Sequence, residues 1–123
     1  MRDKLLEEYM VDTFDYINDS QNKIIKDGKV SKNLKTIAAS FGPNVYTMGL
    51  LSTWRLYGSK KGDYGTMLSM LWDLYTSKNP EAKNEDSQEY VNSHKNVKDF
   101  RRHLLCASVA IKLTLRTYDE AEN

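Results

Sequence analysis

The sequence predicts an all-α protein, a compact bundle of about five to six helices. Apolar residues recur at three- and four-residue steps along most of the chain, which is typical of helices that bury one face. The composition is 40% hydrophobic and 28% charged, with six glycines and two prolines, as in ordinary globular proteins. A chain of 123 residues can bury a core of its own, so we expect residues 1–123 to form a single helical domain.

Three helices are expected in the first half of the chain. An apolar stripe that begins at Leu5 predicts a long amphipathic helix over residues 3–26, followed by a turn at residues 26–29. Ser31 can cap a second helix. We expect Gly42 to end that helix in a left-handed conformation and Pro43 to open a third helix, which continues to Tyr57.

The second half predicts three more helices. A glycine-rich connection over residues 58–65 precedes a helix from Thr66 to Thr76, which is apolar on most of its circumference. Residues 77–86 contain little that can enter a core and are expected to form a mobile loop. Ser87 can cap a short helix through Val91, and a last long helix is expected from about Val97 to Tyr118.

Charge is distributed in blocks, although the net charge is only +1. Residues 1–20 and 62–94 are mainly acidic, whereas residues 21–61 and 95–116 are mainly basic. Solvated helix faces would explain this pattern. The functional interpretation is a basic groove for an anionic polymer, with an acidic region that meets a basic partner or a second copy of the chain.

The connection over residues 58–65 is the most distinctive loop. It holds Lys60 and Lys61 between glycines, and Tyr57 and Tyr64 bracket it. Glycine lets backbone approach a phosphate, and an exposed tyrosine can stack on a base, so the loop suits single-stranded nucleic acid. A helix connector with solvated lysines is the simpler interpretation, because the GxxxxGK[ST] spacing of a phosphate-binding loop is absent.

Residues for catalysis or metal binding are sparse. His94 and His103 are too far apart for the i, i+4 ligand spacing, and no cysteine cluster accompanies them. The lone Cys106 lies among apolar residues and is expected to be a buried thiol in a reducing compartment. We therefore expect no enzymatic activity, no metal, no cofactor and no small-molecule substrate.

The sequence also favours a cytoplasmic protein. Both charge signs occur within the first eight residues, where a signal peptide would be apolar. The 19 uncharged residues between Lys35 and Arg55 approach the length of a membrane span, but they include Gly42, Pro43 and Asn44. We interpret that run as buried core, with no membrane contact.

Two segments carry a resemblance to a known family. They are Phe41-x-Pro43-x-Val45-x-x-Met48-Gly49-Leu50-Leu51-x-x-Trp54 and Phe100-Arg101-x-x-Leu104-x-x-Ala107-x-x-Ala110-Ile111-Lys112-Leu113. Together with the acidic first helix and the lysine-rich region after it, they resemble the small helical subunit of the Cmr complex, the type III-B CRISPR RNA-silencing machine. The chain departs from the family at Met48, where an asparagine is usual, and before Ile111-Lys112, where an aromatic residue is usual.

The resemblance implies a non-catalytic subunit in antiviral defence. Copies of such subunits stack along the complex and face the guide RNA and its target RNA, while other Cmr subunits cut RNA. On this basis we predict that the nucleic-acid-facing surface includes Arg55, Lys60, Lys61, Arg101 and Arg102. The acidic first helix is predicted to make subunit contacts through Glu7, Glu8 and Asp12.

A different class of function is also compatible with the sequence. The chain would then be a small helical protein–protein adaptor of another system, whose apolar stripe receives a partner helix and whose lysines are only solvated. Co-purification of one protein without RNA would favour this alternative.

Overall fold

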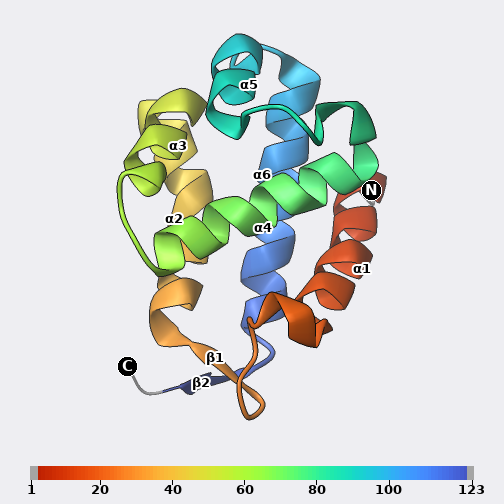
Figure 1. Ribbon diagram of the computed structural model, residues 1–123, viewed down its shortest axis with the longest axis vertical. Coiled ribbons are helices and arrows are strands. Elements are labelled where there is room, and N and C mark those ends of the chain that lie inside the picture. Colours follow the sequence, from red (N-terminus) through yellow and green to blue (C-terminus); the bar gives the residue numbers. More distant parts are fainter. Residues whose placement is uncertain (1–2, 122–123) are drawn as a thin grey trace.

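Helix α6 (Lys98–Leu115) runs through the middle of the computed structural model, which describes residues 3–121 (Figure 1). It packs between α1 (Lys4–Asn18) and α2 (Lys32–Met48). Helix α4 (Asp63–Lys78) crosses these helices on one side, and α5 (Ser87–His94) lies above α4 in Figure 1. Helix α3 (Leu50–Gly58) packs on α2, α4 and α5. The described residues thus contain six α-helices, and the predicted all-α class is confirmed.

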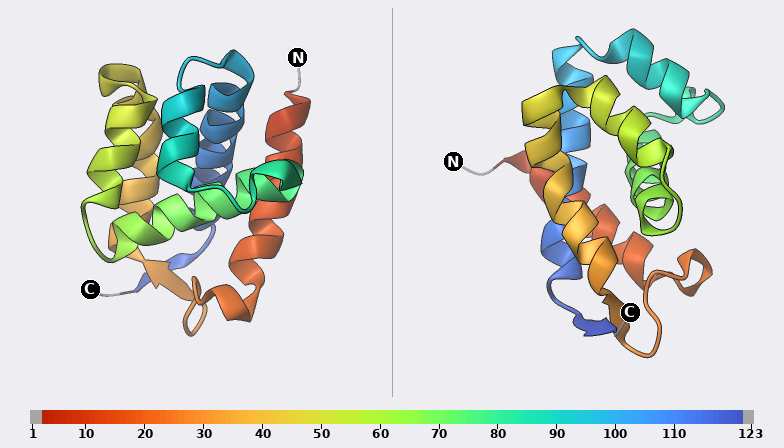
Figure 2. Two further views of the ribbon diagram at one scale, coloured as in Figure 1. Left: turned by 45° about the horizontal axis from the view of Figure 1, so that its top comes forward. Right: turned by 90° about the vertical axis from the view of Figure 1, so that its left-hand side faces the viewer.

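The helices form two layers, which the side view of Figure 2 separates. One layer holds α1, α6 and α2, and the other holds α4 and α5. Buried residues from all six helices form one hydrophobic cluster between and within these layers. Ala107 and Ala110 on α6 are fully buried, and their small side chains let the neighbouring helices approach closely.

The first helix is shorter than the sequence predicts. It ends at Asn18 rather than at residue 26, because Asp19 is extended (φ −74°, ψ 114°) and its carboxylate accepts the N–H of Gln21. A 3₁₀ turn over Ser20–Asn22 follows, and Lys23 is left-handed, with φ 57°. Asp, Ser and Asn side chains compete with helical hydrogen bonds, and this local chemistry outweighs the apolar period.

The predicted break at Gly42 and Pro43 is wrong. Helix α2 continues through both residues to Met48. A proline ring clashes with the Cβ atom of a preceding residue in helical conformation, and Gly42 has no Cβ, so the helix passes at the cost of one backbone hydrogen bond. The break lies at Gly49 instead, whose φ of 88° and ψ of 161° suit glycine alone.

Other helix ends agree with the sequence more closely. Ser31 caps α2 as predicted, since its Oγ accepts the N–H of Leu34 at 3.2 Å. Asp86, not Ser87, caps α5, and its carboxylate accepts the N–H groups of Gln88 and Glu89. The predicted loop over residues 77–86 is partly ordered by a 3₁₀ turn at Pro80–Ala82, in which Ala82 is fully buried.

A short parallel strand pair, which the sequence does not predict, joins the two halves of the chain. Strand β1 (Lys29–Ser31) pairs with β2 (Asp119–Ala121), so the segment after α6 lies beside the segment before α2 (Figure 1). The turn at residues 26–29 is confirmed: Lys26 and Lys29 exchange backbone hydrogen bonds around left-handed Asp27 and Gly28. Three-residue strands give too short a pattern to recognise from sequence.

Substituting Gly49→Ala tests the corrected position of the break. We expect a loss of about 1–3 kcal/mol in the free energy of unfolding, because φ near 88° strains any residue with a Cβ atom. Urea denaturation followed by circular dichroism measures this loss. As a matched control, Gly65→Ala lies inside α4 with open space around its Cβ and should stabilise by about 0.5–1 kcal/mol. Equal effects of the two substitutions would contradict this assignment.

Candidate nucleic-acid interface

A pocket of about 340 Å³ lies where the end of α2, the start of α3 and the connection from α5 to α6 meet. We call it the α3 pocket, and it is lined by Met48, Gly49, Leu50, Leu51, Ser52, Lys95, Asn96 and Arg101. Two of these residues are basic and none is acidic. An anion that enters the pocket therefore meets positive charge without a neighbouring carboxylate.

The backbone at the pocket also favours an anion. Gly49 precedes α3 and has no side chain to cap it, so the first N–H groups of this helix have no side-chain partner. The carbonyl of Gly49 is already occupied, because it accepts both the N–H and the hydroxyl of Thr53. The free donors and the positive end of the helix dipole add to the charge of the two basic side chains.

The two basic side chains of the pocket are not neutralised by the rest of the chain. Lys95 donates to Oδ1 of Asn92 at 3.1 Å, which orients its ammonium group without cancelling its charge. Arg101 lies exposed on the first turns of α6. Neither residue forms an ion pair within residues 3–121. Both charges therefore remain available to a ligand.

An exposed aromatic residue precedes the pocket residues at the end of α2, and the sequence reasoning missed it. Tyr46, on the last turn of α2, is 93% exposed, and the pocket residue Met48 is 40% exposed. The signal for Tyr46 is that it directly follows buried Val45, since consecutive residues of a helix point about 100° apart.

The predicted nucleic-acid residues do not all lie at this pocket. Arg101 lines it, and exposed Arg55 lies one turn beyond Leu51 on α3. Lys60 and Lys61 are exposed in the loop that follows the other end of α3, and Lys60 Nζ lies 4.8 Å from the ring centroid of Tyr64. Arg102 instead turns toward α1 and donates to Asp3 at 3.1 Å.

The proposed stacking role of Tyr57 is wrong. Its side chain is 1% exposed, and its hydroxyl lies 2.7 Å from Ser40 Oγ and 3.2 Å from Asn44 Nδ2. Tyr64 packs edge-on against Tyr57, with ring centroids 5.0 Å apart. The predicted connection over residues 58–65 is shorter in the structure, because α3 ends at Gly58 and α4 begins at Asp63. Tyr57 and Tyr64 therefore belong to these two helices and act mainly in packing.

A second basic pocket, of about 250 Å³, lies near the turn at residues 26–29. Lys23, Lys26 and Lys29 line it, but so does Asp63, whose carboxylate accepts a 2.6 Å hydrogen bond from Ser31. The carboxylate opposes binding of an anion. The α3 pocket is therefore the better candidate for a phosphate group.

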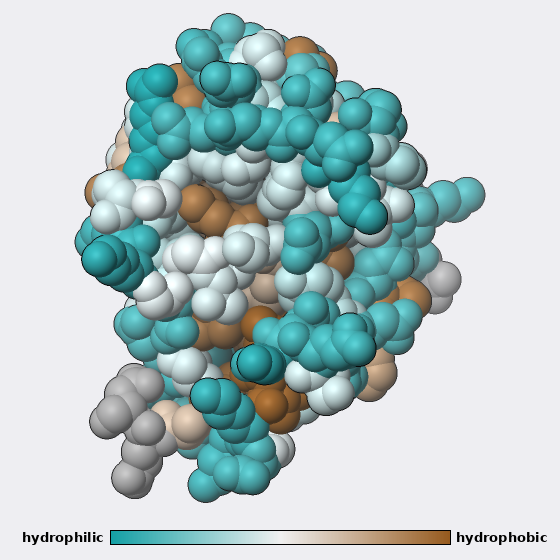
Figure 3. Space-filling model, viewed as in Figure 1, coloured by the Kyte–Doolittle hydropathy of each residue, from teal (hydrophilic) through white to brown (hydrophobic). Residues whose placement is uncertain are grey.

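Hydrophilic residues cover both ends of the face shown in Figure 3, over α5 at the top and around the strand pair at the bottom. Apolar surface on this face shows mostly in its middle, with smaller areas at the top and along the edges.

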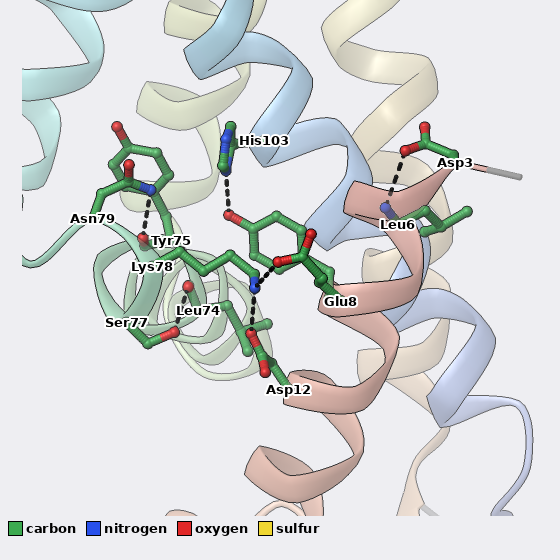
Figure 4. A network of polar contacts seen from close by, with 11 residues as sticks. Asp3, Leu6, Glu8, Asp12, Leu74, Tyr75, Ser77, Lys78, Asn79 and His103 are labelled. Carbon is green, nitrogen blue, oxygen red and sulfur yellow. Dashed lines mark hydrogen bonds and ion pairs between the residues drawn. The ribbon is translucent and has the colours of Figure 1, made fainter.

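The predicted subunit-contact residues lie on α1, where Glu8 and Asp12 both form an ion pair with one lysine of α4. Lys78 reaches from α4 to Glu8 at 3.2 Å and to Asp12 at 3.1 Å (Figure 4). Glu7 is exposed on the same helix. A contact to another subunit through Glu8 or Asp12 would therefore compete with an ion pair inside the chain.

Histidine, tyrosine and carboxylate side chains meet between α1 and α6, as they would in many catalytic sites. The Tyr9 hydroxyl and His103 Nδ1 share a 2.8 Å hydrogen bond, and His103 Nε2 lies 3.7 Å from Asp99. Burial raises the pKa of Tyr9 and lowers the pKa of His103. Because Tyr9 is fully buried, we assign this network to packing of α1 on α6.

Within residues 3–121, no three His, Cys, Asp or Glu side chains are grouped so that they could hold a metal ion. The Cys106 thiol is only partly buried, and burial raises its pKa. None of the described helices combines the length and the apolar character needed to cross a membrane.

Comparisons with known proteins do not assign this chain to a family. No protein-family model matches the sequence, and neither a curated protein nor a solved structure matches it. The candidate interface therefore depends on its geometry alone.

The His103 network predicts a pH-dependent stability. Desolvation lowers the pKa of His103 below 6.5, with Arg102 and Lys78 adding to the effect and Asp99 and Glu8 opposing it. Below that pH the unfolded chain binds more protons than the folded chain, so the free energy of unfolding should fall as pH decreases from about 7 to about 5.5.

Urea midpoints measured across this pH range test the prediction. A His103→Asn variant, which keeps a hydrogen-bonding group near Tyr9, should lose much of the pH dependence. The control variant His94→Asn, which removes the other histidine, should keep it. Identical pH profiles for wild type and His103→Asn would contradict the prediction.

Proposed function

We propose that this chain binds the backbone of single-stranded RNA at the α3 pocket, as a non-catalytic small subunit of a type III-B CRISPR (Cmr) effector complex. The observation that carries the RNA contact is the convergence of Lys95 and Arg101 on the start of α3, without a carboxylate in the lining. The assignment to a Cmr complex rests on the resemblance of the two sequence segments described above.

The chemistry of the pocket fits a phosphodiester rather than a base. Two cationic side chains and unpaired backbone donors recognise phosphate oxygens, and such contacts carry no sequence information. Tyr46, exposed three residues before Gly49 of the pocket, adds a flat apolar surface on which a base of any kind can stack. A subunit that follows a guide paired to many different targets needs contacts of this sequence-independent kind.

The other residues predicted from sequence have secondary places in this proposal. Arg55 extends the basic surface along α3, and Lys60 and Lys61 offer a further contact beyond its other end. Arg102 contributes only when its ion pair with Asp3 opens. The proposed partners are other Cmr subunits, copies of this chain, guide RNA and target RNA, in the cytoplasm.

The adaptor function remains the second candidate, and one observation favours it. The outer face of α1 and α6 exposes large apolar side chains, including Val11 at 63% and Phe14 at 57%. Exposed apolar patches of this kind mark protein contacts.

A tagged pull-down from native lysate separates the two candidates. Recovery of several larger CRISPR subunits with guide RNA would support the Cmr assignment. Recovery of one unrelated protein without RNA would reject that assignment and support the adaptor.

Neutralising the α3 pocket should weaken RNA binding and its salt dependence. For the double variant Lys95→Gln/Arg101→Gln, we expect the slope of log affinity against log salt to fall by about 1.4, from about 0.7 for each lost phosphate contact. Fluorescence anisotropy with a labelled uridine oligonucleotide measures the slope. The charge-matched control Lys32→Gln/Lys83→Gln removes two exposed lysines elsewhere and should leave the slope nearly unchanged. An equal change in both variants would reject the pocket as the binding site.

The contribution of Tyr46 can be measured separately. Tyr46→Ala should weaken binding of the same oligonucleotide by about 1–3 kcal/mol, the range for loss of one base–aromatic stack. Tyr46→Phe keeps the ring and should retain most of the affinity. Because the side chain is 93% exposed, neither change should alter the urea midpoint. Unchanged affinity in Tyr46→Ala would exclude stacking at this position.

A further inference from the structure

An apolar groove of about 500 Å³ runs along the outer side of the contact between α1 and α6. It is lined by Met10, Val11, Phe14, Asp15, Leu113, Thr114 and Thr117, and we call this surface the α1–α6 face. Val11, Phe14 and Leu113 are 63%, 57% and 37% exposed. Three large apolar side chains on neighbouring helices form a patch of the kind that marks a contact with another protein.

The edges of this face carry opposite charges. Asp15 lies at the α1 edge, where it also borders an acidic recess with Asp12, Asp19 and Asp73. Arg116 lies exposed directly after α6, one turn beyond Leu113. Neither Asp15 nor Arg116 forms an ion pair within residues 3–121.

The two charges lie at the same level along the helices. Helices α1 and α6 run in the same direction (Figure 1), and hydrogen bonds between the two segments join residues separated by 94 positions (Tyr9 to His103), 99 positions (Asp3 to Arg102), 100 positions (Asn18 to Tyr118) and 103 positions (Asp3 to Cys106). Asp15 lines the groove together with Thr114 and Thr117, and Arg116 lies between these two threonines in the sequence. The apolar residues Val11 and Phe14 lie level with Leu113 and Thr117 in the same way.

We infer that two copies of this chain pair through the α1–α6 face, about a two-fold axis parallel to the two helices. Rotation about such an axis places α1 of each copy against α6 of its partner. Each residue keeps its height along the helix axis, so residues at equal height in one copy face each other across the interface. Asp15 then meets Arg116 of the partner subunit, twice by symmetry. Val11 and Phe14 pack against Leu113 of the partner subunit, also twice.

The charges distinguish this axis from the other way of placing the same faces together. A two-fold axis perpendicular to the helices would set α1 against α1, so that acidic edges would meet, and α6 against α6, so that basic edges would meet. Like charges in contact disfavour that arrangement. Only the parallel axis covers the apolar groove and pairs the edge charges at once.

A second copy fits the face better than an unrelated partner because the face is complementary to itself. Both helices contribute exposed apolar side chains to the face. An acidic residue flanks them on the α1 side and a basic residue flanks them on the α6 side, at a similar height along the helices. This pairing involves no residue of the α3 pocket, so it stands whether or not the chain binds RNA.

The test is a charge exchange measured by sedimentation equilibrium of the purified chain without RNA, up to about 0.5 mM. We expect a concentration-dependent dimer for the wild type. Asp15→Arg and Arg116→Asp should each weaken it by about tenfold or more, since each places two like-charge pairs in the interface. Mixing the two single variants should restore dimerisation, because the heterodimer has an opposite-charge pair at both positions.

Two further variants test whether the apolar part of the α1–α6 face forms the dimer interface. Phe14→Ala should weaken the dimer by about tenfold or more through lost apolar contact, whereas Lys83→Gln, outside the face, should leave it unchanged. Both Asp15→Arg and Arg116→Asp lie on the surface, and circular dichroism verifies that they fold. A chain that stays monomeric at the highest concentration would overturn the proposal and leave the face to a different protein. A dimer that is insensitive to the charge exchange would overturn it as well.

Discussion

The burial of α6 between α1, α2 and α4 is the constraint on which the rest of the structure depends. Leu104, Ala107, Ile111 and Leu115 are fully buried on this helix. Complete burial of a leucine or isoleucine side chain contributes about 1.5–3 kcal/mol, so these contacts alone are comparable with the whole net stability of a small domain, about 5–15 kcal/mol. The strand pair and the polar network around Lys78 join segments that the packing of α6 has already brought together.

The same helix positions both surfaces for which we propose a role. Arg101 and Arg102 are adjacent in sequence, but a rotation of about 100° per residue sends Arg101 to the α3 pocket and Arg102 to Asp3 on the α1 side. Farther along the helix, Leu113 lines the α1–α6 face, and exposed Arg116 follows directly after the helix. An RNA contact and a second copy of the chain therefore use different sides of one rigid element, and each leaves the other accessible.

Polar groups inside the bundle link neighbouring helices. The Tyr57 hydroxyl meets Ser40 and Asn44 of α2, and the Tyr9 hydroxyl meets His103 of α6. These two tyrosine hydroxyls thus have partners on a neighbouring helix, which avoids the cost of desolvating an unpaired polar group. Within residues 3–121, the buried Thr13 hydroxyl on α1 has no such partner. Tyrosines that resemble nucleic-acid contacts in the sequence are thus used in the core, while Tyr46, within an apolar run, remains on the surface.

The sequence by itself determined the helical class, the cap at Ser31 and the turn at residues 26–29, because apolar period, capping side chains and turn glycines act over a few residues. It did not determine the end of α1 at Asn18 or the passage of α2 through Pro43, where local alternatives differ by little energy. Only the tertiary structure decided that Lys95 and Arg101 share a pocket with the start of α3, that Arg102 is paired, and that Phe14, Asp15 and Leu113 line one groove. These relations join residues far apart in the chain, and they arise from the packing angles and rotations of whole helices, which no local pattern records.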